Sequence, residues 1–250
     1  MTHSIFKSHF LKIIYLVILM ICVTPLYMYF SQDVQKLKTH FPHRSMRPDT
    51  HRFAIMTGRP KGWVGFNQIS PFARWAIILS EDWSFYQHDG VDVKQIKIAL
   101  NDMIEEKKFR GASTITQQMV KNVYLSSDRT IWRKIHEMIL SKKVENVLSK
   151  ERILEIYLNV IEFGPGVYGI RNASNHYFQK SPNALTAREG AFLAMLLPGP
   201  KRFYISFRNK RLTNAARKRV QAILVKMRMG KVISPEQFEI QSVSKMNWEQ

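Results

Sequence analysis

Two neighbouring carboxylates, Glu81 and Asp82, follow the apolar run at residues 75–79 after a single serine. Such a run predicts a buried helical turn, so we expect both side chains where packed core gives way to a cleft. A carboxylate at such a border can have its pKa raised by desolvation, which suits a general base that works near neutral pH. An ordinary solvated helix end would show the same residues, so this stretch alone leaves both interpretations open.

A second polar stretch lies at residues 110–122. The pattern Thr114-x-x-Gln117 fits a capping box and predicts a helix that runs to about Leu125. The N-terminus of such a helix, with its hydroxyls and free N–H groups, is a ready anion site, and Lys121 lies one turn after Gln117. A polar cap on a surface helix is the plain alternative. The uncharged hydrogen-bonding side chains of this stretch are Ser113, Thr114, Thr116, Gln117 and Gln118.

A third stretch places Arg129, Arg133 and Glu137 at i, i+4 and i+8. Asp128 is suited to cap a helix over residues 129–148, in which these three side chains share one face. A surface ladder of ion pairs, worth a few tenths of a kcal/mol per pair, would have the same spacing.

Together the three stretches resemble the signature motifs of glycosyltransferase family 51, the peptidoglycan glycosyltransferases. The pattern Glu-Asp-x-x-Phe-x-x-His-x-Gly is matched at Glu81, Asp82, Phe85, His88 and Gly90. The pattern Gly-x-Ser-Thr-Ile-Thr-Gln-Gln is matched at Gly111 and at residues 113–118, and residues 133–137 resemble Arg-Lys-x-x-Glu. The resemblance covers roughly residues 62–235.

The resemblance implies a mainly α-helical, lysozyme-like domain with a small membrane-proximal lobe. It also implies polymerisation of lipid II, with the lipid-linked nascent glycan strand as donor. Glu81 would be the general base and Glu137 the second functional carboxylate. A carboxylate aimed at pyrophosphate would repel it, so Glu137 must act through a bridging cation, such as Mg²⁺ or Mn²⁺, or in protonated form. The residues expected to bind sugar and pyrophosphate are Lys121, Arg129, Arg133, Ser113, Thr114, Gln117 and Gln118, and those expected to support the motifs are Asp82, Phe85, His88, Gly90 and Gly111.

The composition is strongly basic, which predicts that the protein binds an anionic partner. Among 250 residues there are 38 Lys or Arg and 19 Asp or Glu, which gives a net charge of +19. Nucleic acid, an anionic membrane surface and a phosphorylated substrate are all compatible with this excess. Residues 10–30 form an apolar run whose one charged residue is Lys12, long enough at about 1.5 Å per residue to cross a bilayer. This run favours membrane lipids over nucleic acid as the partner. Cys22 is the one cysteine, which excludes an internal disulfide.

The chain divides into five expected segments. More basic residues follow the apolar run than precede it, so charge alone does not favour a cytoplasmic N-terminus. The family resemblance does favour a cytoplasmic N-terminus, which puts the catalytic domain on the outer face of the cytoplasmic (inner) membrane. It also implies contacts to other cell-wall synthesis or division proteins. The segments are a cytoplasmic tail (1–9), a single transmembrane anchor (10–30), a juxtamembrane connector (31–60), the glycosyltransferase domain (61–235) and a C-terminal tail (236–250).

Three further patterns complete the domain. Helical spacing predicts an amphipathic helix at 91–105, followed by a charged loop, and a helix capped by Ser149 that ends near Asn159. Gly190 stands where the family usually has alanine, which is expected to loosen that helix slightly. Residues 201–231 contain eleven Lys or Arg and no acid, which predicts a basic amphipathic helix suited to anionic lipid headgroups.

Two other functions fit parts of this sequence. A lysozyme-like muramidase also uses a glutamate in a sugar cleft, but it needs no cationic clamp for a pyrophosphate. A non-catalytic membrane tether would leave the motifs unexplained. No penicillin-binding transpeptidase motifs are found, so we expect a monofunctional enzyme.

Overall fold

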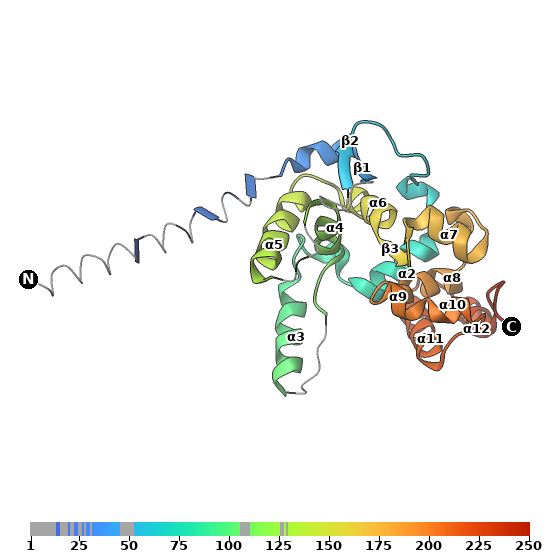
Figure 1. Cartoon of the computed structure of the whole chain (residues 1–250). Coiled ribbons are helices and arrows are strands. Elements are labelled where there is room, and N and C mark those ends of the chain that lie inside the picture. The colour runs from blue at the N-terminus through green and yellow to red at the C-terminus, as the bar shows by residue number, and fades with distance from the viewer. Residues whose placement is uncertain are drawn as a thin grey trace, which may run out of the picture.

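A computed structural model describes residues 14–15, 20, 23–24, 27, 29–30, 32–45, 53–105, 111–125, 128 and 130–250. The chain folds mainly into helices, as predicted, around one continuous apolar core (Figure 1). The helices are α2 (Pro71–Glu81), α3 (Val93–Glu105), α4 (Ile115–Tyr124), α5 (Ile131–Glu145), α6 (Lys150–Val160), α7 (Ile170–Phe178), α8 (Ala187–Leu196), α9 (Pro200–Phe203), α10 (Ile205–Arg208), α11 (Asn214–Met229) and α12 (Pro235–Val243).

Two short antiparallel hairpins and four 3₁₀ turns complete the described elements. Strand β1 (Phe41–Arg44) pairs with β2 (Phe53–Met56), and β3 (Glu162–Gly164) pairs with β4 (Val167–Tyr168). The 3₁₀ turns are η1 (Val34–Lys38), η2 (Phe66–Gln68), η3 (Phe85–Gln87) and η4 (Pro182–Ala184). The first hairpin lies in the expected connector, and Val34 and Leu37 just before it are fully buried in the core. Part of this segment therefore packs on the domain.

The helices form two packed groups that meet near the end of α2. Helix α2 packs on α8 and α11, while α4 packs on α5 and α6. In α11 the buried side chains include Val220, Ile223, Leu224 and Met227, which recur at helical spacing and form the apolar face of the predicted amphipathic helix. The other face of α11 is basic and exposed.

The contact between α2 and α8 depends on Gly190. A Cβ atom at this position would lie 2.8 Å from Cα of Ala73 and 3.1 Å from O of Phe72, both in α2. The absence of a side chain lets the two helices approach closely. The sequence predicted only that Gly190 would loosen α8. Its main role in the structure is to let α2, the helix that ends in Glu81, pack closely against α8.

Most predicted helix boundaries are confirmed within a few residues, and one cap is wrong. Helix α5 begins at Ile131 because the Thr130 side chain, rather than Asp128, accepts the N-terminal hydrogen bond from Arg133 N. Ser149 caps α6 as predicted. The charged loop expected after α3 and most of the expected anchor at 10–30 lie outside the described residues. Within the part that the structure describes, no helix is long and apolar enough to cross a bilayer.

Helix α3 differs from the others because it has no buried residue. It extends away from the rest of the molecule (Figure 1). Several of its apolar side chains are exposed, and Ile104 reaches 73%. The amphipathic pattern is therefore present, but its apolar side does not pack on this core.

Candidate active site

Glu81 is the last residue of α2, at the point where this helix leaves the core. Ala76, Ile77 and Ile78 anchor the helix in the interior, and the backbone turns away at Asp82. The Glu81 carboxylate accepts a hydrogen bond from Gln118 Nε2 at 3.0 Å. Burial raises the pKa of Glu81 above its ordinary value, and the hydrogen bond from Gln118 counteracts this in part. This confirms the pKa direction expected for a carboxylate at the border of core and cleft.

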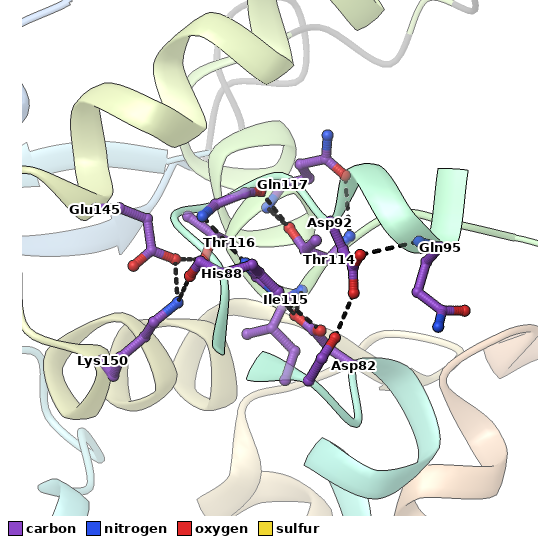
Figure 2. Close-up of polar contacts among 12 residues, drawn as sticks. Asp82, His88, Asp92, Gln95, Thr114, Ile115, Thr116, Gln117, Glu145 and Lys150 are labelled. Atoms are coloured by element: carbon purple, nitrogen blue, oxygen red, sulfur yellow. Dashed lines mark hydrogen bonds and ion pairs between the residues drawn. The ribbon is translucent and has the colours of Figure 1, made fainter. Parts of the chain in front are cut away.

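Asp82, the next residue, has a different environment from Glu81. Its carboxylate accepts hydrogen bonds from His88 Nε2 at 2.9 Å and from the backbone N–H of Ile115 at 2.9 Å (Figure 2). Asp82 is buried and joins the loop after α2 to the first turn of α4. Both oxygens of Asp82 therefore have protein partners that hold the loop in place.

The remaining residues of the first motif hold this loop against α5. Phe85 is fully buried. Gly90 has a φ of +85°, and a Cβ there would lie 2.7 Å from the carbonyl oxygen of Ser141, so glycine is required on both grounds. The carbonyl of Gly90 accepts a hydrogen bond from the Thr114 hydroxyl at 2.7 Å, which ties the first motif to the second.

The start of α4 has the predicted capping box. Thr114 accepts from Gln117 N, and the Gln117 side chain accepts from Thr114 N at 2.9 Å (Figure 2). Both side chains are buried. The carboxylate of Asp82 accepts the hydrogen bond of the Ile115 amide. A side chain of the protein therefore lies where the sequence predicted a site for an external anion. The first turn of α4 is thus anchored by the protein itself.

Glu137 is the centre of a second cluster, on α5. It is only 2% exposed, and its two oxygens accept hydrogen bonds from Arg133 and Lys134. Lys134 Nζ also donates to the Ser113 hydroxyl at 2.9 Å, so the cluster reaches the loop before α4. The predicted pairing of Arg133 with Glu137 is confirmed. It is a buried interaction rather than a rung of a surface ladder.

A pocket of roughly 480 Å³, counting the space open to solvent, lies between the end of α2, the loop before α4 and α11. Glu81 and Ser113 both line it, as do Gly111 and Lys226. Lys226 donates a hydrogen bond to the carbonyl oxygen of Leu79 at 2.9 Å. Its charge acts on Glu81 by lowering the pKa of that carboxylate, against the larger effect of burial.

Three site residues were missed by the sequence interpretation. Lys134 follows Arg133 directly, and its i, i+3 spacing to Glu137 could have indicated the contact. The apolar spacing around Tyr157 predicts a core residue, yet its hydroxyl donates to Gln118 Oε1 at 2.9 Å. Lys226 was one of many cations in a basic helix, and nothing local distinguishes it.

Two of the residues expected to bind the pyrophosphate are not among those that line the pocket in the described part of the chain. Lys121 lies on the exposed side of α4 and does not line the pocket. Arg129 lies outside the described residues.

A divalent metal at Glu137 does not fit the geometry around it. Both carboxylate oxygens already accept from cationic side chains, Arg133 and Lys134. In the described ranges, no group of three or more His, Cys, Asp and Glu side chains converges to hold a metal ion. The charge of Glu137 is balanced by arginine and lysine.

Comparison with known proteins agrees with the fold and with these motifs. The family described as Transglycosylase matches residues 50–228, and the chain belongs to this family. Proteins named biosynthetic peptidoglycan transglycosylase from Nitrosomonas eutropha and Brucella suis are each 45% identical to it, over 157 and 148 residues. The aligned parts cover 62% and 59% of this chain, and 64% and 66% of those proteins, just under two thirds of their length. A protein of the same name from Shewanella frigidimarina is 42% identical over 160 residues, which cover 63% of this chain and 71% of that protein.

Proposed function

We propose that this protein is a peptidoglycan glycosyltransferase that polymerises lipid II into glycan strands. The observation that carries the proposal is that a pocket lined by a partly buried carboxylate, Glu81, is connected through Ser113 to a cationic cluster on α5. Glu81 and Ser113 line the same pocket, and Ser113 is held by Lys134, which pairs with Glu137. A transfer that breaks a bond to pyrophosphate needs both a base and fixed cations.

In this reaction Glu81 removes the proton from the 4-hydroxyl of the N-acetylglucosamine of lipid II. The oxygen attacks the anomeric carbon of the lipid-linked glycan strand, and the bond from that carbon to the pyrophosphate breaks. Attack from the opposite side inverts the configuration from α to β. The raised pKa of Glu81 supports this role, because a base with a pKa closer to neutral holds the transferred proton more readily.

The leaving pyrophosphate gains negative charge, which Arg133 and Lys134 are placed to stabilise from α5. Glu137 holds both cations by accepting a hydrogen bond from each, so its own charge is neutralised before the substrate arrives. This arrangement removes the repulsion that a bare carboxylate would exert on pyrophosphate. Lys121 and Arg129 remain expected members of the clamp. Ser113 and Gly111 would contact the substrate, whereas the buried Thr114 and Gln117 act by shaping the loop.

The proposed reaction takes place at the outer face of the cytoplasmic membrane, where both substrates are anchored by lipid. The exposed apolar side chains of α3 support this location, since exposed apolar surface of this kind marks contact with a membrane or partner. Ile131 and Trp132 at the start of α5 are exposed as well. The proposal includes the anchor at 10–30 and a lysozyme-like arrangement of the helical domain.

The test is a gel assay of the purified full-length protein in detergent with labelled lipid II. Wild type should give a ladder of lengthening glycans, and Glu81→Gln should give none while remaining folded. Retained polymerisation in Glu81→Gln would remove Glu81 from the role of base. Shortening of a preformed glycan, with lipid II left intact, would instead identify a muramidase. No change in either substrate would identify a non-catalytic tether.

A further inference from the structure

A chain of two hydrogen bonds links Glu81 to a fully buried hydroxyl. Tyr157, on α6, is 0% exposed, and its hydroxyl donates to Gln118 Oε1 at 2.9 Å. The other end of the same amide, Nε2, donates to Glu81 Oε2 at 3.0 Å. Side chains of α6, α4 and α2 are thus connected in one line that ends at the pocket.

The direction of this chain is set by Tyr157. The two ends of a glutamine amide have almost the same shape, so its orientation is decided by its hydrogen-bond partners. Burial, reinforced by the charges of Glu81 and Asp82, raises the pKa of the Tyr157 hydroxyl well above its usual range, so this group keeps its proton. If the Gln118 amide turned over, the Tyr157 proton would lose its acceptor at a site closed to water.

The orientation of the Gln118 amide decides whether an N–H group or a carbonyl oxygen faces the Glu81 carboxylate. In the observed orientation an N–H group faces the carboxylate and favours its charged form. In the reversed orientation a carbonyl oxygen would face it and favour the protonated form, which is useless as a base. The other groups that act on Glu81 are Ser80, Lys226 and Asp82, and none of them depends on the Tyr157 hydroxyl.

We propose that Tyr157 is a positioning residue for the transfer reaction, whose hydroxyl fixes the amide of Gln118 so that this amide donates to Glu81. Gln118 Nε2 then occupies Oε2 of the carboxylate. Among the hydrogen bonds of the described residues, the other oxygen, Oε1, accepts a long contact of 3.4 Å from the Ser80 hydroxyl, which leaves it available to the attacking hydroxyl. This proposal rests on the proposed function of the same pocket.

The experiment compares Tyr157→Phe with Tyr177→Phe. Tyr177 is a matched control because it is also buried, and its hydroxyl donates to the carbonyl oxygen of Phe163 at 2.9 Å, in a different network. Turnover of labelled lipid II is measured from pH 5 to 9. Tyr157→Phe should lower kcat by about tenfold with little change in KM, as expected for loss of a hydrogen bond that supports a charged group. The acidic limb of its kcat profile should move to higher pH, while Tyr177→Phe keeps the wild-type profile.

A second readout does not depend on turnover. In protein labelled with ¹³C at the glutamate carboxyl carbons, the Glu81 signal is assigned by its loss in Glu81→Gln. Its titration midpoint should rise in Tyr157→Phe and stay at the wild-type value in Tyr177→Phe. An unchanged midpoint in folded Tyr157→Phe would overturn the proposal. If wild type fails to polymerise lipid II, the proposed function fails, and the titration still decides whether Tyr157 controls Glu81.

Discussion

Lys134 Nζ lies 2.9 Å from the Ser113 hydroxyl, which joins α5 to the loop that opens α4. The same ammonium group pairs with Glu137 on its own helix. One side chain therefore connects the second motif of the sequence with the third. Its position explains how residues far apart in the chain come to line one site.

Lys134→Ala should remove a cation from the leaving group and reduce kcat by about 10²-fold, the loss typical of one electrostatic contact in a transition state. The measurement is the initial rate of lipid II polymerisation. Lys142→Ala is the control, because Lys142 is exposed on the same helix, whereas the contacts to Ser113 and Glu137 are made by Lys134. Equal rates for the two variants would show that Lys134 is only structural.

Glu81→Gln should make the folded protein more stable at neutral and higher pH. Burial raises the pKa of Glu81 above its ordinary value of 4.5, so the folded protein binds this proton more tightly than the unfolded chain. The stability gained from this tighter proton binding is fully present at pH values below the ordinary pKa of glutamate. It is lost as the pH rises through the raised pKa of the folded protein. The melting temperature of the variant should therefore exceed that of wild type at pH 8, by about 2–4 °C for each kcal/mol gained.

The same comparison at pH 4 provides the control for Glu81→Gln. Both proteins then have an uncharged side chain at this position, and the difference in melting temperature should shrink. A variant that is less stable than wild type at pH 8 would contradict the assigned pKa direction.

Gly190→Ala should destabilise the protein, because its Cβ would enter the contact between α8 and α2 at 2.8 Å from Cα of Ala73. Overpacking of this kind costs about 1–3 kcal/mol. Denaturant unfolding measures the change in the free energy of unfolding. At Gly58 a Cβ would meet nothing within 4 Å, so Gly58→Ala should leave that free energy nearly unchanged.

Trp248→Ala should lower stability by about 3 kcal/mol, the cost of truncating a large buried aromatic side chain. Trp248 is 7% exposed and packs against Phe192 and Phe207, with ring centroids 5.1 and 5.4 Å away. Thermal melting measures the effect. Val243→Ala tests the specificity, because Val243 is 82% exposed in the same C-terminal segment and its truncation should change little.

Local features of the fold could be predicted from the sequence because they depend on neighbouring residues. The capping box of Thr114 and Gln117 is one example, and the cap of Ser149 on α6 is another. The ion pair of Arg133 and Glu137 follows from helical spacing. The family motifs also predict a functional role for Glu81 from the sequence alone.

Long-range contacts could not be predicted in the same way. Tyr157 reads as a core tyrosine because its apolar neighbours determine the pattern, and its hydrogen bond to Gln118 depends on how α4 packs on α6. The entry of Lys226 into the pocket depends on the rotation of α11 against α2. Asp82 took the place expected for an external anion because a loop brought it to the start of α4, which no spacing rule reveals.

Because α3 has no buried residue, its sequence is nearly free of the constraints that folding imposes on the other helices. Substitutions in α3 should be selected mainly for their effect on what the exposed helix contacts, rather than for their effect on folding. At the proposed membrane location, related proteins in membranes of different composition should therefore diverge at α3 while their cores stay alike. The part of α3 after Gln95, a residue that lines the pocket together with Glu81, is also a natural segment to exchange between relatives in chimaeras, because it has no buried residue.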